Sequence, residues 1–225
     1  MGRPIDRYVP TANQEVALTR LSFTITWTCL KSHGYSVSDP EPADYPAFQR
    51  GVLRDLVVRS DVYGFFDTQT VDTYGYLRPP SIPDHVALEP SNAVPDDIAS
   101  ACQSAGAHVI APAGRDQLPN GGPQLATKDQ RVVAAKGQWA ACMARHGLAI
   151  NDPIDAIGRH LTSTPADRAV AQTDVACKQE TNFVGIASGV QAEIDNAYVT
   201  ANLQALKSYA ATVAALLRQA AQAAR

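Results

Sequence analysis

The sequence predicts an all-α protein with two related helix–cysteine units, irregular Pro/Gly-rich insertions and a long C-terminal helix. Three observations lead to this prediction. The stretch CLKSHGYSVSDP, which begins at Cys29, returns without a gap as CMARHGLAINDP, which begins at Cys142. Apolar residues at three- and four-residue spacing precede the first copy, as they do on one face of a helix. Residues 166–225 contain no proline, so nothing there forbids a long helix.

The first helix is expected to begin at Thr11, because Gln14 follows three residues later in a capping-box pattern. Its apolar face continues to Cys29, and it is expected to end at Gly34. Glycine adopts the left-handed conformation that closes many helices without a steric penalty. The same pattern predicts a second helix at about 125–146.

The repeated histidines, His33 and His146, directly precede these closing glycines. We interpret them as capping residues that bond the last carbonyls of each helix, in preference to a metal-binding or catalytic role. Each copy then ends in Asp-Pro, at 39–40 and 152–153. Asp as N-cap and Pro at the first helical position predict the start of the next helix.

The chain has four cysteines, and each copy of the repeat is followed by one more cysteine on a predicted helix. The repeat therefore predicts two bridges: Cys29–Cys102 and Cys142–Cys177. The chain-entropy model assigns each bridge about 4 kcal/mol of stabilisation. Such bridges persist only in an oxidising compartment. Four buried free thiols in a cytosolic protein remain the alternative.

The insertion at 40–95 holds two Tyr-Gly pairs and a cluster of aromatic residues. These aromatics could line a ligand pocket or fill a small core, and the core is the favoured interpretation. The candidate ligand-binding residues are Tyr63, Phe65, Phe66, Tyr74 and Tyr76. The segment RPPSIPDHVALEP after them is too rich in proline for a helix or a central strand.

A helix carrying Cys102 is expected to begin at Asp96 and to end at Gly106, followed by a Gly/Pro-rich linker at 107–124. The chain is then a single helical domain, 1–225, with a first cysteine segment at 11–106 and a second at 125–225. Trp27 and Trp139, each within three residues of a cysteine, are interpreted as core anchors beside the bridges rather than as ligand-stacking residues.

The last helix, from Pro165 to the C-terminus, would be about 90 Å long if it were continuous. It must therefore bend, at Gly185 and Gly189, or project from a globule about 45 Å across. Its tail has an apolar seam of heptad type. The candidate partner-binding residues on this seam are Val199, Leu203, Leu206, Val213 and Leu217. The alternative is that the seam packs back on the first helix or on the insertion.

The second cysteine segment resembles a family of uncharacterised actinomycete proteins that are exported, often as lipoproteins. The motifs that carry the resemblance are W-x-x-C-M-x-x-x-G and A-x-x-D-x-x-C-K, followed by an extended terminal helix. The matching residues are Trp139, Cys142, Met143, Gly147, Asp174, Cys177 and Lys178. The resemblance extends to the first half and implies export and a Cys142–Cys177 bridge, but no activity. No lipobox cysteine precedes the domain, so a lipid anchor would belong to a native precursor.

Several function classes receive no support from the sequence. The net charge is −3, so the chain lacks the excess of basic residues that is typical of nucleic-acid-binding proteins. The sequence has no run of 18 apolar residues, so it predicts no membrane span. The first residues lack the apolar region of an export signal. The sequence has no C-x-x-C pair and no histidine at zinc-ligand spacing from a cysteine, so no metal site is predicted. No cofactor motif is present either. No catalytic residue is assigned, because no nucleophile or acid–base motif is found.

The leading functional hypothesis is therefore a non-catalytic, extracytoplasmic interaction module of the cell envelope or secretome. Its C-terminal helix would bind a protein partner or a second copy of the chain. The second hypothesis is an exported small-ligand-binding protein that uses the aromatic insertion. The third is an enzyme of unknown class, which would need loop histidines to meet a carboxylate in the fold.

Overall fold

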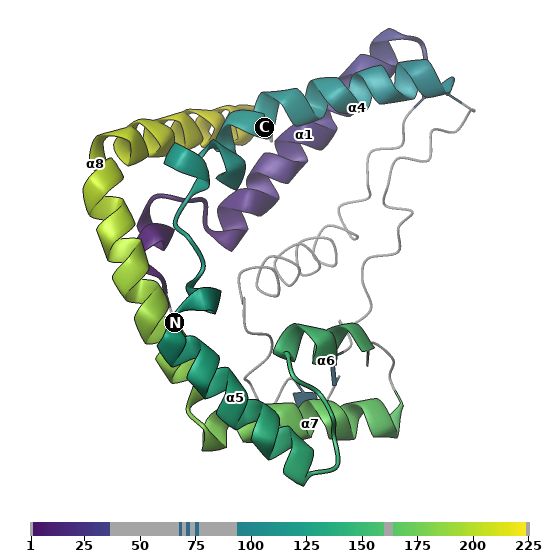
Figure 1. Cartoon of the computed structure of the whole chain (residues 1–225). Coiled ribbons are helices and arrows are strands. Elements are labelled where there is room, and N and C mark those ends of the chain that lie inside the picture. Colours follow the sequence, from purple (N-terminus) through teal and green to yellow (C-terminus); the bar gives the residue numbers. More distant parts are fainter. Residues whose placement is uncertain are drawn as a thin grey trace. The chain divides into compact units, whose positions relative to one another are not determined.

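The structure of the protein is a computed structural model that describes residues 2–36, 68, 71–72, 75–76, 94–159 and 164–223. These residues form helices and connecting turns with no strand among them, which confirms the all-α prediction (Figure 1). The α-helices with given bounds are α1 (Ala12–Ser32), α4 (Asp96–Ile110), α5 (Gln130–Arg145), α6 (Pro153–Arg159), α7 (Pro165–Glu180) and α8 (Phe183–Ala223). Short 3-10 helices lie at Pro4–Arg7, Ala111–Ala113, Arg115–Gln117, Pro119–Gly121 and Ala126–Lys128.

The chain divides into two compact units, and neither is continuous in sequence. Unit 1 consists of Met1–Arg3, Val57–Pro80 and Gln124–Ala197. Unit 2 consists of Pro4–Leu56, Ser81–Pro123 and Tyr198–Arg225. The predicted cysteine segments follow the order of the chain, whereas each unit combines stretches that are far apart in sequence. Each unit contains one cysteine pair.

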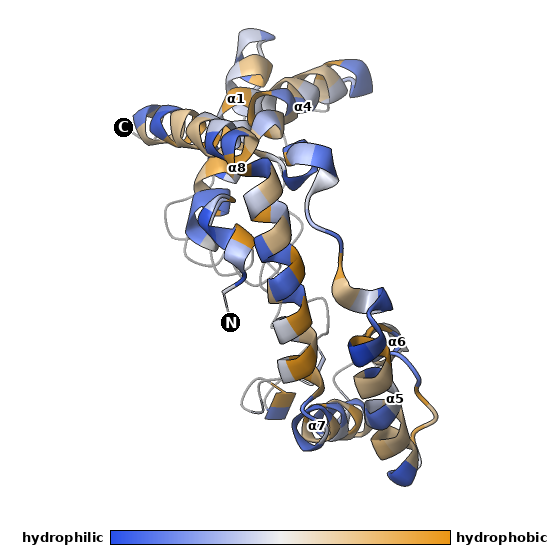
Figure 2. Cartoon of the chain, turned by 60° about the vertical axis from the view of Figure 1, so that its left-hand side comes forward, coloured by the Kyte–Doolittle hydropathy of each residue, from blue (hydrophilic) through white to orange (hydrophobic). Residues whose placement is uncertain are grey.

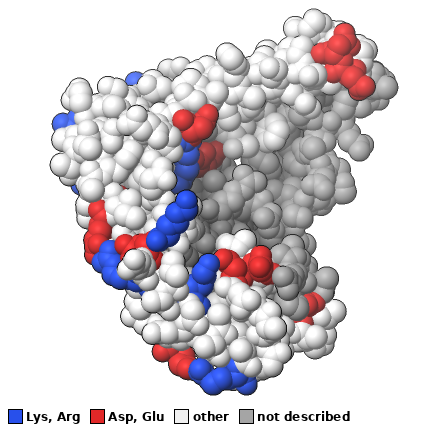
Figure 3. Space-filling model, viewed as in Figure 1, with Lys and Arg blue, Asp and Glu red and all other residues white. Residues whose placement is uncertain are grey.

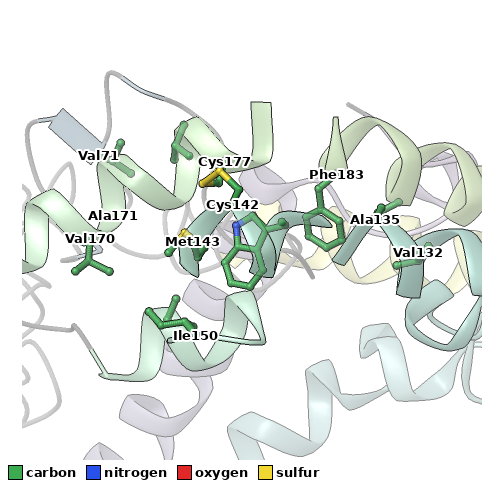
Figure 4. Close-up of a cluster of buried hydrophobic side chains, with 14 of the residues drawn as sticks. Val71, Val132, Ala135, Cys142, Met143, Ile150, Val170, Ala171, Cys177 and Phe183 are labelled. Atoms are coloured by element: carbon green, nitrogen blue, oxygen red, sulfur yellow. A yellow bond between two sulfur atoms is a disulfide. The ribbon is translucent and has the colours of Figure 1, made fainter. Parts of the chain in front are cut away.

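Unit 1 has its apolar core between α5, α6, α7 and the first part of α8 (Figure 4). Trp139, Met143 and Phe183 are its largest apolar side chains, and all three are at most 1% exposed. The described part of the insertion belongs to this core, because Val71 and Tyr76 are buried in it. Burial of one such side chain contributes about 1.5–3 kcal/mol.

Unit 2 has two smaller apolar clusters. One is formed by Trp27, Leu30 and Cys102, where α1 and α4 pack together. The other joins the start of the chain, α1, the segment after α4 and the C-terminal half of α8. Its buried residues are Ile5, Val9, Leu18, Ala113, Leu118, Val199, Leu206, Tyr209 and Val213. The C-terminal half of α8 is therefore part of the core of unit 2.

Local sequence signals place several helix ends correctly. The Thr11 hydroxyl accepts from the Gln14 backbone N–H, and the Gln14 side chain accepts from the Thr11 N–H, so the predicted capping box is present. Asp152 accepts from the Ile154 N–H at the start of α6, as the Asp-Pro pattern predicts. Gly34 and Gly147 have φ values of +86° and +77°, which confirms their predicted role in helix closure. The first Asp-Pro pair, at 39–40, lies outside the described residues.

The prediction that Gly106 ends its helix is wrong, because α4 continues to Ile110. Gly106 lies where α4 packs against α1: a Cβ there would be 2.4 Å from the Ser22 carbonyl oxygen and from Thr26 Oγ1. The glycine is needed for close helix packing rather than for a turn. The second predicted helix also starts later than 125, because the Asp129 carboxylate caps α5 by accepting from the Arg131 N–H.

The long C-terminal run is broken, but not at its glycines. α7 ends at Glu180, and Asn182 takes a φ of +50°, a conformation that asparagine tolerates better than most residues. Gly185 stays helical and leaves room for the Asn182 side chain, since a Cβ there would lie 2.2 Å from Asn182 Oδ1. α8 then runs for 41 residues, with non-helical angles at Asn202. Figure 2 shows polar and apolar residues alternating along this helix.

Candidate functional site

Both predicted disulfides are present. Cys29 of α1 is bonded to Cys102 of α4, with 5.5 Å between their Cα atoms. Cys142 of α5 is bonded to Cys177 of α7, with 5.7 Å between their Cα atoms. No cysteine is free, so the alternative of four thiols does not describe this structure. In each unit the bridge joins two helices that meet in an apolar cluster.

A buried polar network lies next to the Cys142–Cys177 bridge. Asp174 is completely buried, and its carboxylate accepts from Trp139 Nε1 at 2.9 Å and from Lys178 Nζ at 2.8 Å. Asp174 and Lys178 are four residues apart on α7, a spacing that on an exposed helix face adds only a few tenths of a kcal/mol. Here they form a buried ion pair next to the bridge, because both side chains have no exposed surface.

The insertion contributes Tyr76 to this network. Burial, the Asp174 charge and a hydrogen bond to Asp174 all raise the pKa of the Tyr76 hydroxyl. Burial also raises the pKa of Asp174, while Lys178 acts in the opposite direction. Gln172 of α7 donates to the Asp72 carboxylate at 2.9 Å, which holds the same stretch of the insertion against α7. The network thus fastens the insertion to the core of unit 1.

A second buried carboxylate, that of Asp195 in α8, lies in a hydrogen-bonded cluster that joins the ends of the stretches that form unit 1. Arg3 donates two hydrogen bonds to it, at 2.8 and 2.7 Å, in a bidentate ion pair. Gln191 also donates to Asp195, and its amide bonds the backbone of Gln124 and Ala126. Sequence patterns do not reveal this cluster, because its members lie far apart in the chain. No pattern of neighbouring residues marks Arg3, Gln191 or Asp195.

The two histidines cap their helices with the backbone rather than with the side chain. The His33 N–H donates to the carbonyl oxygens of Cys29 and Leu30, and the His146 N–H donates to that of Met143. The imidazoles lie beside the bridges instead. In each unit the histidine nitrogen and the two sulfur atoms all lie within 4.8 Å of one another.

No histidine was expected at zinc-ligand spacing from a cysteine, and the structure differs from this expectation. Cys29 and Cys142 lie in the last turns of α1 and α5, and His33 and His146 follow four residues later as the C-cap residues, so each pair lies on one side of a helix end. The third member of each cluster, Cys102 or Cys177, comes from the bridged helix. The repeated C-x-x-x-H spacing was the signal that could have predicted the clusters.

The candidate partner-binding residues of α8 have unequal exposure. Val199, Leu206 and Val213 are at most 7% exposed and belong to the core of unit 2, and Leu217 packs against it. Leu203 alone among the five is largely exposed, at 42%. Two tyrosines of α8 fix this arrangement: Tyr198 donates to the Pro119 carbonyl and Tyr209 to that of Ala113, both at 2.6 Å. A role of the seam in binding a partner stays a prediction.

The candidate ligand-binding aromatics fall largely outside the described residues, where Tyr63, Phe65, Phe66 and Tyr74 lie. Tyr76 is described and is 1% exposed in the core of unit 1. Its ring is therefore a packing element and its hydroxyl a member of the Asp174 network. For this residue the structure agrees with the interpretation of the aromatics as core.

Among the described residues, none of the helices combines the length and apolar character needed to cross a membrane. A comparison of the chain with protein-family models, curated proteins and solved structures finds no match.

Proposed function

We propose that the protein is a non-catalytic, extracytoplasmic interaction module, stapled by two disulfides, that binds a protein partner through the exposed side of α8. The extracytoplasmic compartment is inferred from the presence of both bridges with no free cysteine. Disulfides of this kind persist in oxidising compartments and are rare in the reducing cytosol. The resemblance to exported actinomycete proteins points the same way.

The use of the buried ionisable groups supports a structural role. Asp174 and Tyr76 have raised pKa values, and Asp174 and Lys178 are completely buried. Ionisable groups with such properties are common in active sites. These three residues interact with one another and with Trp139 inside the core of unit 1, where Asp174 and Lys178 have no surface for a substrate. Asp195 is likewise enclosed by Arg3 and Gln191.

The composition of the outer side of α8 supports partner binding. After Asp195 the described part of this helix has only two charged residues, Lys207 and Arg218. Small exposed alanines, among them Ala211 and Ala215, lie on the side opposite the buried seam, and Leu203 lies at its edge. Figure 3 shows few charged residues over this part of the molecule. A low-charge helix face suits packing against another helix better than it suits free exposure.

The test is a pull-down from envelope and culture-medium fractions with the oxidised chain as bait. The variant Ala211→Glu/Ala215→Glu adds two charges to the outer side of α8 without touching the core. The matched control is Ala134→Glu/Ala141→Glu, which adds two charges to exposed positions of α5. A protein retained by the wild type and the control, but lost with the α8 variant, is the expected result.

Equal retention by all three baits would contradict the assignment to α8. Sedimentation of the purified wild type and α8 variant distinguishes a foreign partner from self-association. If the wild type is a dimer and the α8 variant a monomer, the partner is a second copy of the chain.

A further inference from the structure

Each unit contains a cluster of one histidine and two cysteines with the same construction. The first cysteine and the histidine lie four residues apart on one helix, and the second cysteine comes from the neighbouring helix. The clusters are Cys29, His33, Cys102 in unit 2 and Cys142, His146, Cys177 in unit 1. In both, the three possible ligand atoms lie within 4.8 Å of one another.

Helix capping does not account for the histidine side chains. The cap is made by the backbone N–H of His33 and of His146, which almost any residue would supply. Both histidines are exposed residues, yet their imidazoles lie beside the sulfur atoms in both units. The side chain, rather than the backbone, is therefore the repeated feature that needs a separate explanation.

We propose that, when its cysteines are thiols, each cluster binds one zinc ion through two thiolates and one imidazole. Thiolate and imidazole are the ligands that zinc prefers, and three protein ligands leave the fourth tetrahedral position open to water. With Zn–S near 2.3 Å and Zn–N near 2.0–2.1 Å, the two sulfurs and the nitrogen of a tetrahedral site lie about 3.5–3.8 Å apart. The clusters approach this spacing once the two sulfurs separate by rotation of their side chains.

The bridged and the zinc-bound states exclude each other at a given cluster, because both use the same sulfur atoms. A dithiol reductant converts the bridge to two thiols and is itself oxidised to a disulfide. Binding of Zn²⁺ then displaces the two thiol protons to solvent. The zinc form therefore belongs to the chain before its bridges have formed, or after a dithiol has reduced them. It goes beyond the proposed interaction function and does not depend on it.

The test uses Co²⁺ as a spectroscopic substitute for zinc. The protein is reduced with a phosphine, freed of the reductant without oxygen and titrated with Co²⁺, and then Zn²⁺ is added. The expected result is two ions per chain, thiolate-to-cobalt charge-transfer bands with tetrahedral d–d bands, and complete displacement by zinc. The oxidised protein is the first control and is expected to show none of these bands.

The variant His33→Asn/His146→Asn tests the imidazole ligands. It is expected to weaken Co²⁺ binding at least about tenfold, since loss of even an outer-shell partner costs 10–100-fold. The matched control is His108→Asn, which changes an exposed histidine of α4 that belongs to neither cluster. Its affinity is expected to equal that of the wild type.

Circular dichroism during the titration keeps the test decisive if reduction unfolds the chain. Helix recovered in proportion to the first two equivalents of Zn²⁺ supports the proposal, because metal binding then drives folding. Binding with equal affinity in the double histidine variant would overturn it and leave only non-specific thiolate binding. Failure of the reduced chain to bind Co²⁺ or Zn²⁺ would overturn it as well.

Discussion

The two units contain the same repeated phrase in different surroundings. In unit 1, Cys142 and Cys177 are both completely buried in a core with Trp139, Met143 and Phe183. In unit 2, Cys102 is buried but Cys29 is half-buried, and the cluster around them is much smaller. One short sequence pattern can therefore end a helix and place a cysteine equally well at the centre of a core or at its edge.

The tryptophans beside the two bridges show the same difference in polar contacts. Trp139 Nε1 donates to Asp174 at 2.9 Å. Trp27 is 7% exposed, and its Nε1 has no hydrogen-bond partner among the residues that the structure describes. A buried donor without an acceptor costs about 1–3 kcal/mol. The tryptophan beside the bridge of unit 1 is thus held by a hydrogen bond as well as by packing, whereas the tryptophan beside the bridge of unit 2 is held by packing.

Removal of the bridges has the largest expected effect. The chain-entropy model depends only on the separation of the cysteines, which is 73 residues for the Cys29 pair and 35 for the Cys142 pair. It predicts a loss of about 4 kcal/mol for each Cys→Ala pair, slightly more for the longer loop. Urea unfolding of the two double variants measures both losses. A clearly larger loss for the Cys142 pair would show that burial outweighs loop length.

Asp174→Ala is expected to cost about 3 kcal/mol or more, because it removes the carboxylate that pairs with the charged Lys178 inside unit 1. The matched change Asp97→Ala, at an exposed position in the first turn of α4, is expected to cost less than about 1 kcal/mol. Urea unfolding gives both values. Recovery of stability in Asp174→Ala/Lys178→Met would identify the buried Lys178 charge as the cause, and no recovery would contradict it.

Replacement of the two tryptophans is expected to reduce the free energy of unfolding by a smaller amount, which differs between the two units. Trp139→Phe removes a hydrogen bond to a buried carboxylate and should cost about 1–3 kcal/mol. Trp27→Phe removes a donor without a described acceptor and should cost less. Urea unfolding followed by circular dichroism, which reports the helices of both units, measures the two losses. Equal losses would show that ring volume rather than hydrogen bonding decides.

The pH dependence of stability is the smallest expected effect and has opposite signs at two sites. Burial raises the pKa of Asp174, so the folded state binds more protons than the unfolded state between the ordinary value, near 4, and the raised one. Its contribution to the free energy of unfolding therefore falls as pH rises through this window. Hydrogen bonding to Arg131 lowers the pKa of Glu193, whose contribution rises as pH rises toward the ordinary value.

Stability measured against pH for the wild type, Asp174→Asn and Glu193→Gln checks these signs. The difference between the wild type and Asp174→Asn should shrink with rising pH, and the difference from Glu193→Gln should grow. A difference from Asp174→Asn that grows with pH would show that Lys178 outweighs burial at this carboxyl.

Local signals explain how much of the fold could be predicted. The capping box at Thr11, the Asp152-Pro153 start and the glycines after His33 and His146 act within one helical turn, so their effect can be read from neighbouring residues. The pairing of the cysteines followed from the internal repeat. These predictions needed no knowledge of which helices meet.

Several features of the candidate site needed the tertiary structure. Gly106 has the same local signature as a helix stop, and only the approach of α1 shows that it serves close packing. The imidazoles beside the bridges depend on which helices return the second cysteines. Arg3, Gln191 and Asp195 have no pattern in sequence because a hydrogen-bonded network joins residues by distance in space.

For the C-terminal helix, the sequence determines one property and the tertiary structure another. The sequence by itself determined that its apolar residues form one seam, because helical periodicity places them on one side. Whether this seam meets the same chain or another protein depends on the surfaces available to it. For Val199, Leu206 and Val213 the structure decided this by burying them in unit 2, and it leaves Leu203 exposed. The hydrophobic effect rewards removal of apolar area from water and does not distinguish an intramolecular partner from a foreign one.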